Sequence, residues 1–222
     1  MSSTSFLKFC GFTSPDDAEA ALSVGADALG FNFWPKSKRY LSPDLAVPWL
    51  RSLAGRTLRM GVFVNAEQSQ VRGLFAANCI DVAQFHGDET PEYCREFAES
   101  GLPFFKALGV KDESSLANLD QWHTPFILLD AWQPEAYGGS GRVFNWDLAR
   151  QAVERNPNLR IILSGGLTPE NVAAAVDASH VAGVDTASGI ESAPGIKDGA
   201  KMAAFAKNYR DSLGNGAVDS SS

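Results

Sequence analysis

Short apolar segments alternate with helical segments along almost the whole of this 222-residue chain, and this alternation limits the fold more than any other feature. The apolar segments have the length of strands and few polar residues, as is typical of parallel strands covered on both faces. The predicted strands span residues 6–10, 27–33, 59–64, 81–85, 103–108, 125–129, 160–163 and 182–186. The predicted helices span residues 15–24, 43–53, 67–77, 91–100, 113–122, 146–154, 169–178 and 197–213. Because such helices suit right-handed crossovers between parallel strands, the pattern predicts an α/β fold.

Eight strand and helix pairs within roughly 210 residues favour a single closed (β/α)8 barrel, the TIM barrel, over an open doubly wound sheet. No linker separates the pairs, so residues 1–213 are expected to form one domain. Residues 214–222 end in three serines and have little to bury, so we expect no ordered structure there. Barrel enzymes work from the carboxyl ends of their strands, and residues at those ends are therefore the candidates for chemistry.

The charge balance narrows the possible partners. A formal net charge of −7 disfavours nonspecific binding to nucleic acid or to anionic membranes, which requires a basic patch. A phosphorylated metabolite remains a candidate, because backbone amides bind phosphate locally whatever the net charge. No signal-type start is present, and no apolar stretch approaches the roughly 20 residues of a spanning helix. We therefore expect a cytoplasmic protein with a small-molecule substrate and neither nucleic acid nor membrane as a partner.

The chain has three cysteines, so one remains unpaired in any disulfide scheme. Cys10, Cys79 and Cys94 are widely spaced and match no metal-ligand pattern, so no metal site is expected. Reduced thiols in a cytosol fit this usage best. Cys79 and Cys94 are expected to be packing residues within or beside helices.

Two ionisable groups end predicted strands and are candidates for acid and base chemistry. Cys10 ends the first strand, and Asp130 follows the apolar residues 126–129. Alternation places Cys10 on the face of Lys8 and Asp130 on the face of Leu128, so both groups can point into the barrel mouth. Partial burial favours a protonated carboxyl, which suits a general acid, and a nearby cation favours a thiolate, which suits a base. The alternatives are a helix N-cap or loop role for Asp130 and a packing role for Cys10.

Two glycine-bearing turns follow the seventh and eighth predicted strands, where barrels of this kind commonly hold phosphate. The first contains Gly165 and Gly166, and the second contains Ser188 and Gly189. Glycine lets the backbone approach an anion closely, and amides at a helix start bind the anion. The alternative is that these glycines only form tight turns.

A third glycine cluster, with Gly139 and Gly141, lies in the long connection after the sixth strand. It either closes over a bound substrate or forms a flexible surface loop. Arg142, which follows it, has no assigned role and is interpreted as a solvated charge.

Four more polar residues are candidates for binding. Gln84 and His86 share a face at the end of the fourth strand, where His86 either contacts substrate or makes a structural hydrogen bond. Lys106 either points inward or forms a structural ion pair. Arg39, after the second strand, carries a planar fork of donors that suits a carboxylate.

In combination, these segments resemble the phosphoribosylanthranilate isomerase family. The segments that carry the resemblance are residues 8–13, 37–42, 61–65, 84–89, 128–130, 138–146 and 164–171. The resemblance implies a (β/α)8 barrel that isomerises N-(5-phosphoribosyl)anthranilate to 1-(2-carboxyphenylamino)-1-deoxyribulose 5-phosphate in tryptophan biosynthesis. It also implies no metal or organic cofactor, because a Schiff base formed within the substrate serves as the electron sink. The oligomeric state is not determined, with a monomer expected and a dimer as the alternative.

The resemblance also implies roles for individual residues. Cys10 matches the general base of the family and Asp130 matches its general acid. Arg39 matches the arginine that meets the anthranilate carboxylate, and the turns at Gly165–Gly166 and Ser188–Gly189 match the phosphate site. Ala187 stands where serine is frequent, which puts one hydrogen bond to phosphate in doubt. The alternative functions are another phosphosugar isomerase or lyase barrel, and a non-catalytic barrel that binds phosphometabolites.

Overall fold

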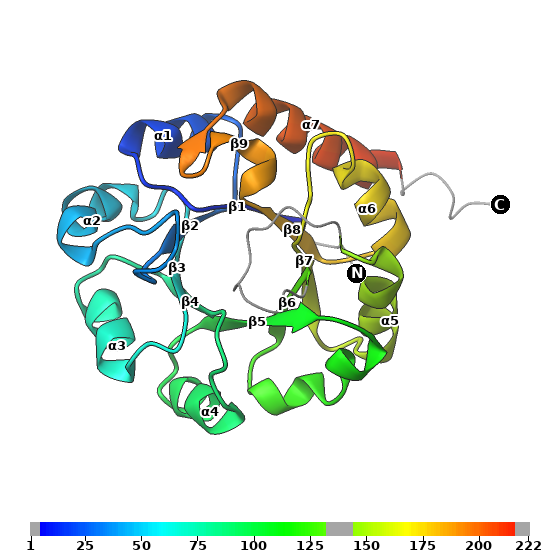
Figure 1. Cartoon of the computed structure of the whole chain (residues 1–222), viewed down its shortest axis with the longest axis horizontal. Coiled ribbons are helices and arrows are strands. Elements are labelled where there is room, and N and C mark those ends of the chain that lie inside the picture. Colours follow the sequence, from blue (N-terminus) through cyan, green and yellow to red (C-terminus); the bar gives the residue numbers. More distant parts are fainter. Residues whose placement is uncertain (1–4, 132–143, 216–222) are drawn as a thin grey trace.

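The fold is a closed barrel of eight parallel strands surrounded by helices (Figure 1). The computed structural model describes residues 5–131 and 144–215. In order around the barrel, the strands are β1 (Phe6–Cys10), β2 (Ala28–Asn32), β3 (Leu58–Phe63), β4 (Val82–Phe85), β5 (Phe104–Val110), β6 (Phe126–Ala131), β7 (Arg160–Leu163) and β8 (Gly183–Thr186). The α-helices are α1 (Pro15–Ser23), α2 (Pro43–Leu50), α3 (Gln68–Ala76), α4 (Pro91–Glu99), α5 (Trp146–Arg155), α6 (Val172–Ser179) and α7 (Gly199–Asn215). The predicted (β/α)8 barrel is confirmed.

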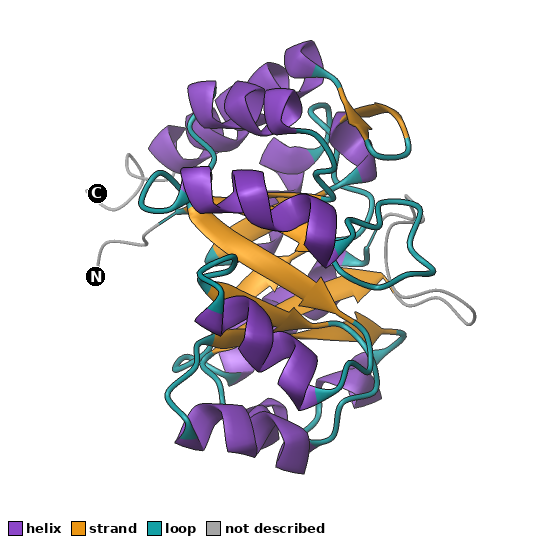
Figure 2. Ribbon diagram, turned by 90° about the vertical axis from the view of Figure 1, so that its left-hand side faces the viewer, coloured by secondary structure: helices purple, strands orange, loops and turns teal. Residues whose placement is uncertain are grey.

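Side chains along each barrel strand alternate between the barrel interior and the helix layer, as the period of two requires. The interior cluster consists of Ala28, Met60, Val82, Phe105, Ala107, Leu128 and Ile162. A larger cluster, which includes Phe9, Phe31 and Phe85, fills the space between strands and helices. Figure 2 shows from the side how the helices cover the strands. Both faces of the sheet are therefore buried, which is why the strands read as apolar runs.

Three helices begin with a proline that directly follows a turn residue. Pro15, Pro43 and Pro91 occupy the first positions of α1, α2 and α4. The missing N–H of proline costs nothing there, because the first turn of a helix has no partner for it.

Over the described residues, no helix has both the length and the apolar character needed to cross a membrane.

The predicted helix over residues 113–122 is wrong. This segment forms two short 3₁₀ helices, η2 (Glu113–Leu116) and η3 (Leu119–Trp122). Between them, Ala117 has an extended backbone with ψ of 140°, and Asn118 is left-handed with φ of 52°. A right-handed helix cannot continue through these two residues.

The sixth α-helix begins later than the predicted residue 169. Asn171 accepts a hydrogen bond from the Thr168 amide at 2.8 Å and donates one to the Gly166 carbonyl at 3.0 Å. These bonds hold the preceding residues in a turn, and α6 starts at Val172. An asparagine that bonds its own backbone competes with the helix in this way.

The segment between β8 and α7 also differs from its prediction. Lys197, predicted as the first residue of the last helix, instead belongs to β10 (Ile196–Lys197), which pairs antiparallel with β9 (Glu191–Ala193). Gly195, with φ of 83°, supplies the left-handed residue of the turn between them. This hairpin lies outside the barrel, near α1 (Figure 1).

Two buried cations on barrel strands face the helix layer and form structural ion pairs. Lys106 Nζ lies 2.8 Å from Glu89 Oε2, and Arg59 Nη2 lies 2.6 Å from Asp81 Oδ1. The structural alternative for Lys106 is therefore the one observed. Removing either carboxylate would leave a buried cation with neutral hydrogen-bond acceptors and no opposite charge, which costs several kcal/mol in typical proteins.

Candidate active site

A narrow cavity of about 60 Å³ lies at the carboxyl ends of the barrel strands. Five predicted site residues line it: Cys10, Arg39, Gln84, His86 and Asp130. The remaining lining residues are Gly11, Asn32, Ser37, Val62, Ser164, Asp185 and Ala187. Closure of the barrel thus unites groups from the first, second, fourth and sixth strand ends in a single cavity.

Cys10 is the last residue of β1 and pairs in register with Gly30 of β2. A Cβ on Gly30 would lie 2.5 Å from Cys10 Sγ, so glycine there leaves room for the thiol. Two residues earlier, Lys8 Nζ donates to Asp185 Oδ1 at 2.8 Å within the barrel. Burial raises the pKa of the Cys10 thiol, and the Lys8 charge lowers it. The predicted cation is present and lowers the thiol pKa as expected, but burial outweighs it and the net shift is upward.

We expect alkylation of Cys10 by iodoacetamide to increase with pH through a midpoint above that of a free thiol. Only the thiolate reacts, and a raised pKa leaves less thiolate at neutral pH. Cys79 and Cys94 are each 0% exposed and serve as slowly labelled references within the same chain. The measurement is peptide mass spectrometry over a pH series, with free cysteine as the comparison. A midpoint at or below that of free cysteine would contradict the dominance of burial.

The Asp130 carboxyl is buried and is held from two sides. The Ala131 amide donates to Oδ1 at 2.8 Å, and His86 Nε2 lies 3.4 Å from Oδ2. The other imidazole nitrogen, Nδ1, lies 3.1 Å from Gln84 Nε2, so His86 bridges Gln84 and Asp130. Gln84 Oε1 is buried without a hydrogen-bond partner among the described residues. A buried acceptor without a donor is destabilising, and a ligand that donates a hydrogen bond to Oε1 would remove this cost.

The two glycine-bearing turns contact each other. A Cβ on Gly189 would lie 1.9 Å from the Leu167 carbonyl oxygen, so only glycine allows this approach. Thr186 Oγ1 donates to the same carbonyl at 2.8 Å. Gly165 and Gly166 have φ of 89° and 68°, values that favour glycine. The loops after β7 and β8 therefore form one joined unit.

This joined unit borders the cavity. Ser164, which precedes the first turn, and Ala187, which precedes the second, both line the cavity wall. Ser188 begins the short 3₁₀ helix η4 (Ser188–Ile190). The predicted phosphate-binding segments are thus brought together beside the thiol and the carboxyl.

The family model described as N-(5'phosphoribosyl)anthranilate (PRA) isomerase matches residues 7–208. The chain belongs to this family. The isomerase is 43% identical over 199 residues to the N-(5'-phosphoribosyl)anthranilate isomerase of Pelobacter propionicus, over 90% of this chain and 92% of that one. It is 41% identical over 208 residues to the enzyme of the same name from Trichlorobacter lovleyi, over 93% and 98% of the two chains.

Solved structures agree with this assignment. The phosphoribosyl anthranilate isomerase of Thermotoga maritima superposes with a TM-score of 0.84 at 38% identity, over 93% of this chain and 99% of that one. A second structure, at 36% identity and a TM-score of 0.81 over 93% and 99% of the two chains, is of a phosphoribosyl anthranilate isomerase in complex with reduced 1-(o-carboxyphenylamino)-1-deoxyribulose 5-phosphate. The alternatives of a different phosphosugar barrel and of a non-catalytic binding barrel receive no support from these matches.

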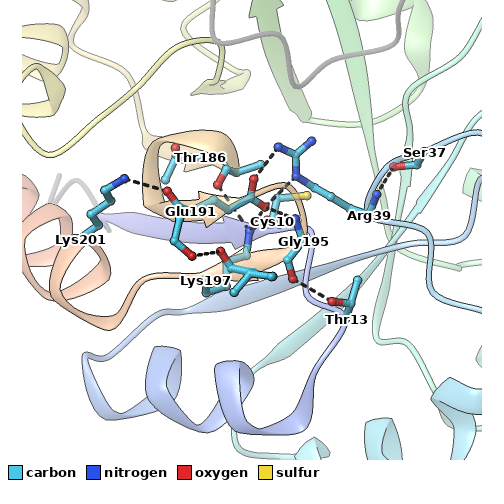
Figure 3. A network of polar contacts seen from close by, with 12 residues as sticks. Cys10, Thr13, Ser37, Arg39, Thr186, Glu191, Gly195, Lys197 and Lys201 are labelled. Atoms are coloured by element: carbon cyan, nitrogen blue, oxygen red, sulfur yellow. Dashed lines mark hydrogen bonds and ion pairs between the residues drawn. The ribbon is translucent and has the colours of Figure 1, made fainter.

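Arg39 enters the site of the isomerase from the loop after β2 and forms a two-point ion pair with Glu191 of β9 (Figure 3). Arg39 Nε donates to Glu191 Oε1 at 2.8 Å, and Nη2 donates to Oε2 at 2.6 Å. The arginine stem crosses Gly11, where a Cβ would lie 2.3 Å from Arg39 Cδ and where φ is 85°. Gly11 is therefore required for the path of this side chain as well as for the exit from β1.

Three further residues of the site, Asp185, Glu191 and Lys197, were not predicted from the sequence. Asp185 and Glu191 bracket the second glycine-bearing turn, so two acidic residues beside a proposed anion site were the available signal. Lys197 was missed because the sequence pattern assigned it to the last helix and not to the hairpin beside the site. Their ion pairs with Lys8 and Arg39 depend on contacts between distant segments.

Some predictions lie outside the described residues. Gly139, Gly141 and Arg142 fall in 132–143, and most of the predicted tail falls in 216–222. Within the part of the chain that the structure describes, no group of three or more histidine, cysteine, aspartate or glutamate side chains could hold a metal ion.

Proposed function

We propose that this isomerase converts N-(5-phosphoribosyl)anthranilate to 1-(2-carboxyphenylamino)-1-deoxyribulose 5-phosphate with Cys10 as general base and Asp130 as general acid. The observation that carries the assignment is that a thiol and a carboxyl from opposite halves of the sequence line one cavity. Acid and base groups within reach of one small substrate are what an internal proton transfer requires.

The first step is ring opening. The protonated Asp130 carboxyl gives its proton to the furanose ring oxygen as the bond from that oxygen to C1′ breaks. The bonding electrons stay on the oxygen, and the lone pair of the anthranilate nitrogen forms a C1′=N double bond. The Ala131 amide, which donates to Oδ1 at 2.8 Å, supports the carboxylate that results.

The second step is proton abstraction. The Cys10 thiolate removes the proton from C2′, and the electron pair moves through C2′ and C1′ to the cationic nitrogen. The neutral enolamine then takes a proton at C1′ and loses the hydroxyl proton at C2′, which yields the ketone. Because the protonated imine is the electron sink, the substrate itself supplies what a cofactor would otherwise provide.

Binding groups are assigned at the ends of the substrate. The backbone of the turns at Gly165–Gly166 and Ser188–Gly189 is proposed to bind the phosphate, because both turns directly follow residues that line the cavity, Ser164 and Ala187, and glycine-bearing turns suit a bound anion. The Arg39 fork is proposed to bind the anthranilate carboxylate. Gln84 and His86 are proposed to form hydrogen bonds with the hydroxyl groups of the opened sugar, because Gln84 Oε1 has no hydrogen-bond donor among the described residues.

The isomerase is proposed to act as a monomer in the cytosol. The three cysteines are free thiols, which a reducing compartment favours. One solved structure of a relative, at 35% identity, is of generated monomers of the dimeric phosphoribosylanthranilate isomerase of Thermotoga maritima, so a dimer is the alternative state. Analytical ultracentrifugation at assay concentration tests this assignment.

The activity is tested by following the loss of substrate fluorescence with purified protein, and by growth of a tryptophan auxotroph that lacks this step. We expect turnover in the assay and growth without tryptophan. A protein that binds the reduced product analogue but neither consumes the substrate nor restores growth would contradict the proposed catalysis.

A further inference from the structure

The Glu191 side chain is enclosed by hydrogen-bond donors and is only 4% exposed. Besides the Arg39 fork, Oε1 accepts from Lys197 Nζ at 2.7 Å and from the Gly195 amide at 3.3 Å. The main chain is fixed as well, since Lys201 Nζ donates to the Glu191 carbonyl at 2.7 Å. Glu191 therefore has little freedom to follow a moving arginine, and its position determines where Arg39 lies.

The same hairpin is fastened to the strand that bears the thiol. Lys197 Nζ donates to the Cys10 carbonyl at 2.6 Å and to the Ala187 carbonyl at 3.4 Å (Figure 3). Thr13 Oγ1 donates to the Gly195 carbonyl at 2.8 Å. The location of Glu191 is thus set relative to β1 and to the turn after β8.

The fork with Glu191 leaves part of the guanidinium for a second carboxylate. Arginine has five N–H donors, and Glu191 engages one on Nε and one on Nη2. The other donors lie on Nη1 and on the outer side of Nη2, along the edge that suits a second two-point contact. Figure 3 shows the remaining terminal nitrogen of Arg39 turned away from Glu191.

The charges around Glu191 leave the site attractive to an anion. Arg39 and Lys197 each carry a positive charge, and one carboxylate lies between them. The three groups sum to one positive charge beside the cavity. Lys197 thus balances Glu191 and keeps the Arg39 charge available, whereas an isolated arginine and glutamate pair would be neutral.

We propose that Glu191 is a positioning residue that sets the selectivity of the isomerase for a substrate carboxylate by fixing the orientation of Arg39. This inference rests on the proposed role of Arg39 at the anthranilate carboxylate. Glu191 itself touches no substrate atom and acts through the guanidinium.

The test compares two ligands that differ by one carboxyl group. Reduced 1-(o-carboxyphenylamino)-1-deoxyribulose 5-phosphate carries it, and reduced 1-phenylamino-1-deoxyribulose 5-phosphate lacks it. Calorimetry gives the ratio of their dissociation constants, which we call the carboxylate selectivity. We expect a selectivity of about 10- to 100-fold in the natural protein, the range typical of a hydrogen bond to a charged group.

Glu191→Gln is expected to lower the carboxylate selectivity about tenfold while the affinity for the ligand without the carboxyl group stays nearly constant. Glu191→Asp keeps the charge, and thus the balance with Lys197, but withdraws the carboxylate by one methylene. It should lower the selectivity too, and it covers the case in which Glu191→Gln folds poorly. Glu19→Gln is the matched control, because Glu19 forms a similar fork with Arg56 on the exposed surface.

A double-mutant cycle separates this inference from the proposed function. If Arg39→Ala removes the selectivity and adding Glu191→Gln changes it no further, Glu191 acts through Arg39. If Arg39→Ala removes the selectivity but both Glu191 variants keep it, the positioning role is overturned while the role of Arg39 stands. Equal weakening of both ligands would mean that Glu191 is only structural. Full selectivity in Arg39→Ala would overturn the carboxylate assignment itself, and the inference with it.

Discussion

Replacing Cys10 with alanine is expected to lower kcat by about 10²–10⁴-fold, the usual contribution of a general base. Alanine keeps the Cβ and removes only the sulfur, so the backbone at the end of β1 and its strand pairing with Gly30 are preserved. Without the thiol, no group at this position can take the C2′ proton. The affinity for the reduced product analogue should remain nearly unchanged, because the proposed phosphate and carboxylate contacts are made by other residues.

The Cys10→Ala result needs a control for the loss of a buried sulfur. Cys94 on α4 is 0% exposed and does not line the cavity, so Cys94→Ala removes a sulfur without touching the site. It should lose some stability and retain its kcat. Near-normal turnover by Cys10→Ala in the fluorescence assay would show that another group is the base.

Replacing Asp130 with asparagine is expected to lower kcat by a similar factor of about 10²–10⁴. Asparagine has nearly the same shape and still accepts the hydrogen bond from the Ala131 amide, so the strand end keeps its geometry. Its amide cannot release a proton to the furanose ring oxygen. Ring opening should then become the slow step, and deuterium at C2′ of the substrate should no longer slow turnover.

Asp147→Asn is the matched control for the Asp130 substitution. Asp147 lies on α5 with a side chain 72% exposed, and it contacts Arg150 on the surface. This variant should have the same kcat and the same isotope effect at C2′ as the unsubstituted protein. If Asp130→Asn slows turnover but retains a full isotope effect at C2′, ring opening is not limited by this residue, and the acid assignment would fail.

The barrel was predictable because its information is local. The strand at residues 6–10 and the apolar run before Asp130 are each readable from a few neighbouring residues. Alternation along these strands correctly placed the Cys10 and Asp130 side chains in the barrel mouth. The segment 113–122 was mispredicted for the opposite reason. Its composition is typical of a helix, but the left-handed backbone of Asn118 prevents one continuous helix from forming.

The pKa of Cys10 could not be predicted from the neighbouring sequence. Lys8 is close in sequence and lowers the thiol pKa, as expected. The size of the burial effect depends on how closely neighbouring strands, such as β2 with Gly30, enclose the sulfur. Asp185, from a distant segment, raises the thiol pKa further by its charge. Desolvation is a property of the assembled barrel and cannot be read from one strand.

The sequence by itself determined the alternating barrel, the reactive groups at its strand ends and the glycines that allow close backbone approach. Each of these follows from side-chain type and spacing within a single segment. Only the tertiary structure decided that Lys197 belongs to a hairpin, that Glu191 grips Arg39 and that burial dominates the thiol pKa. These features depend on distances and dielectric surroundings created between segments far apart in the chain, which exist only once the barrel has closed.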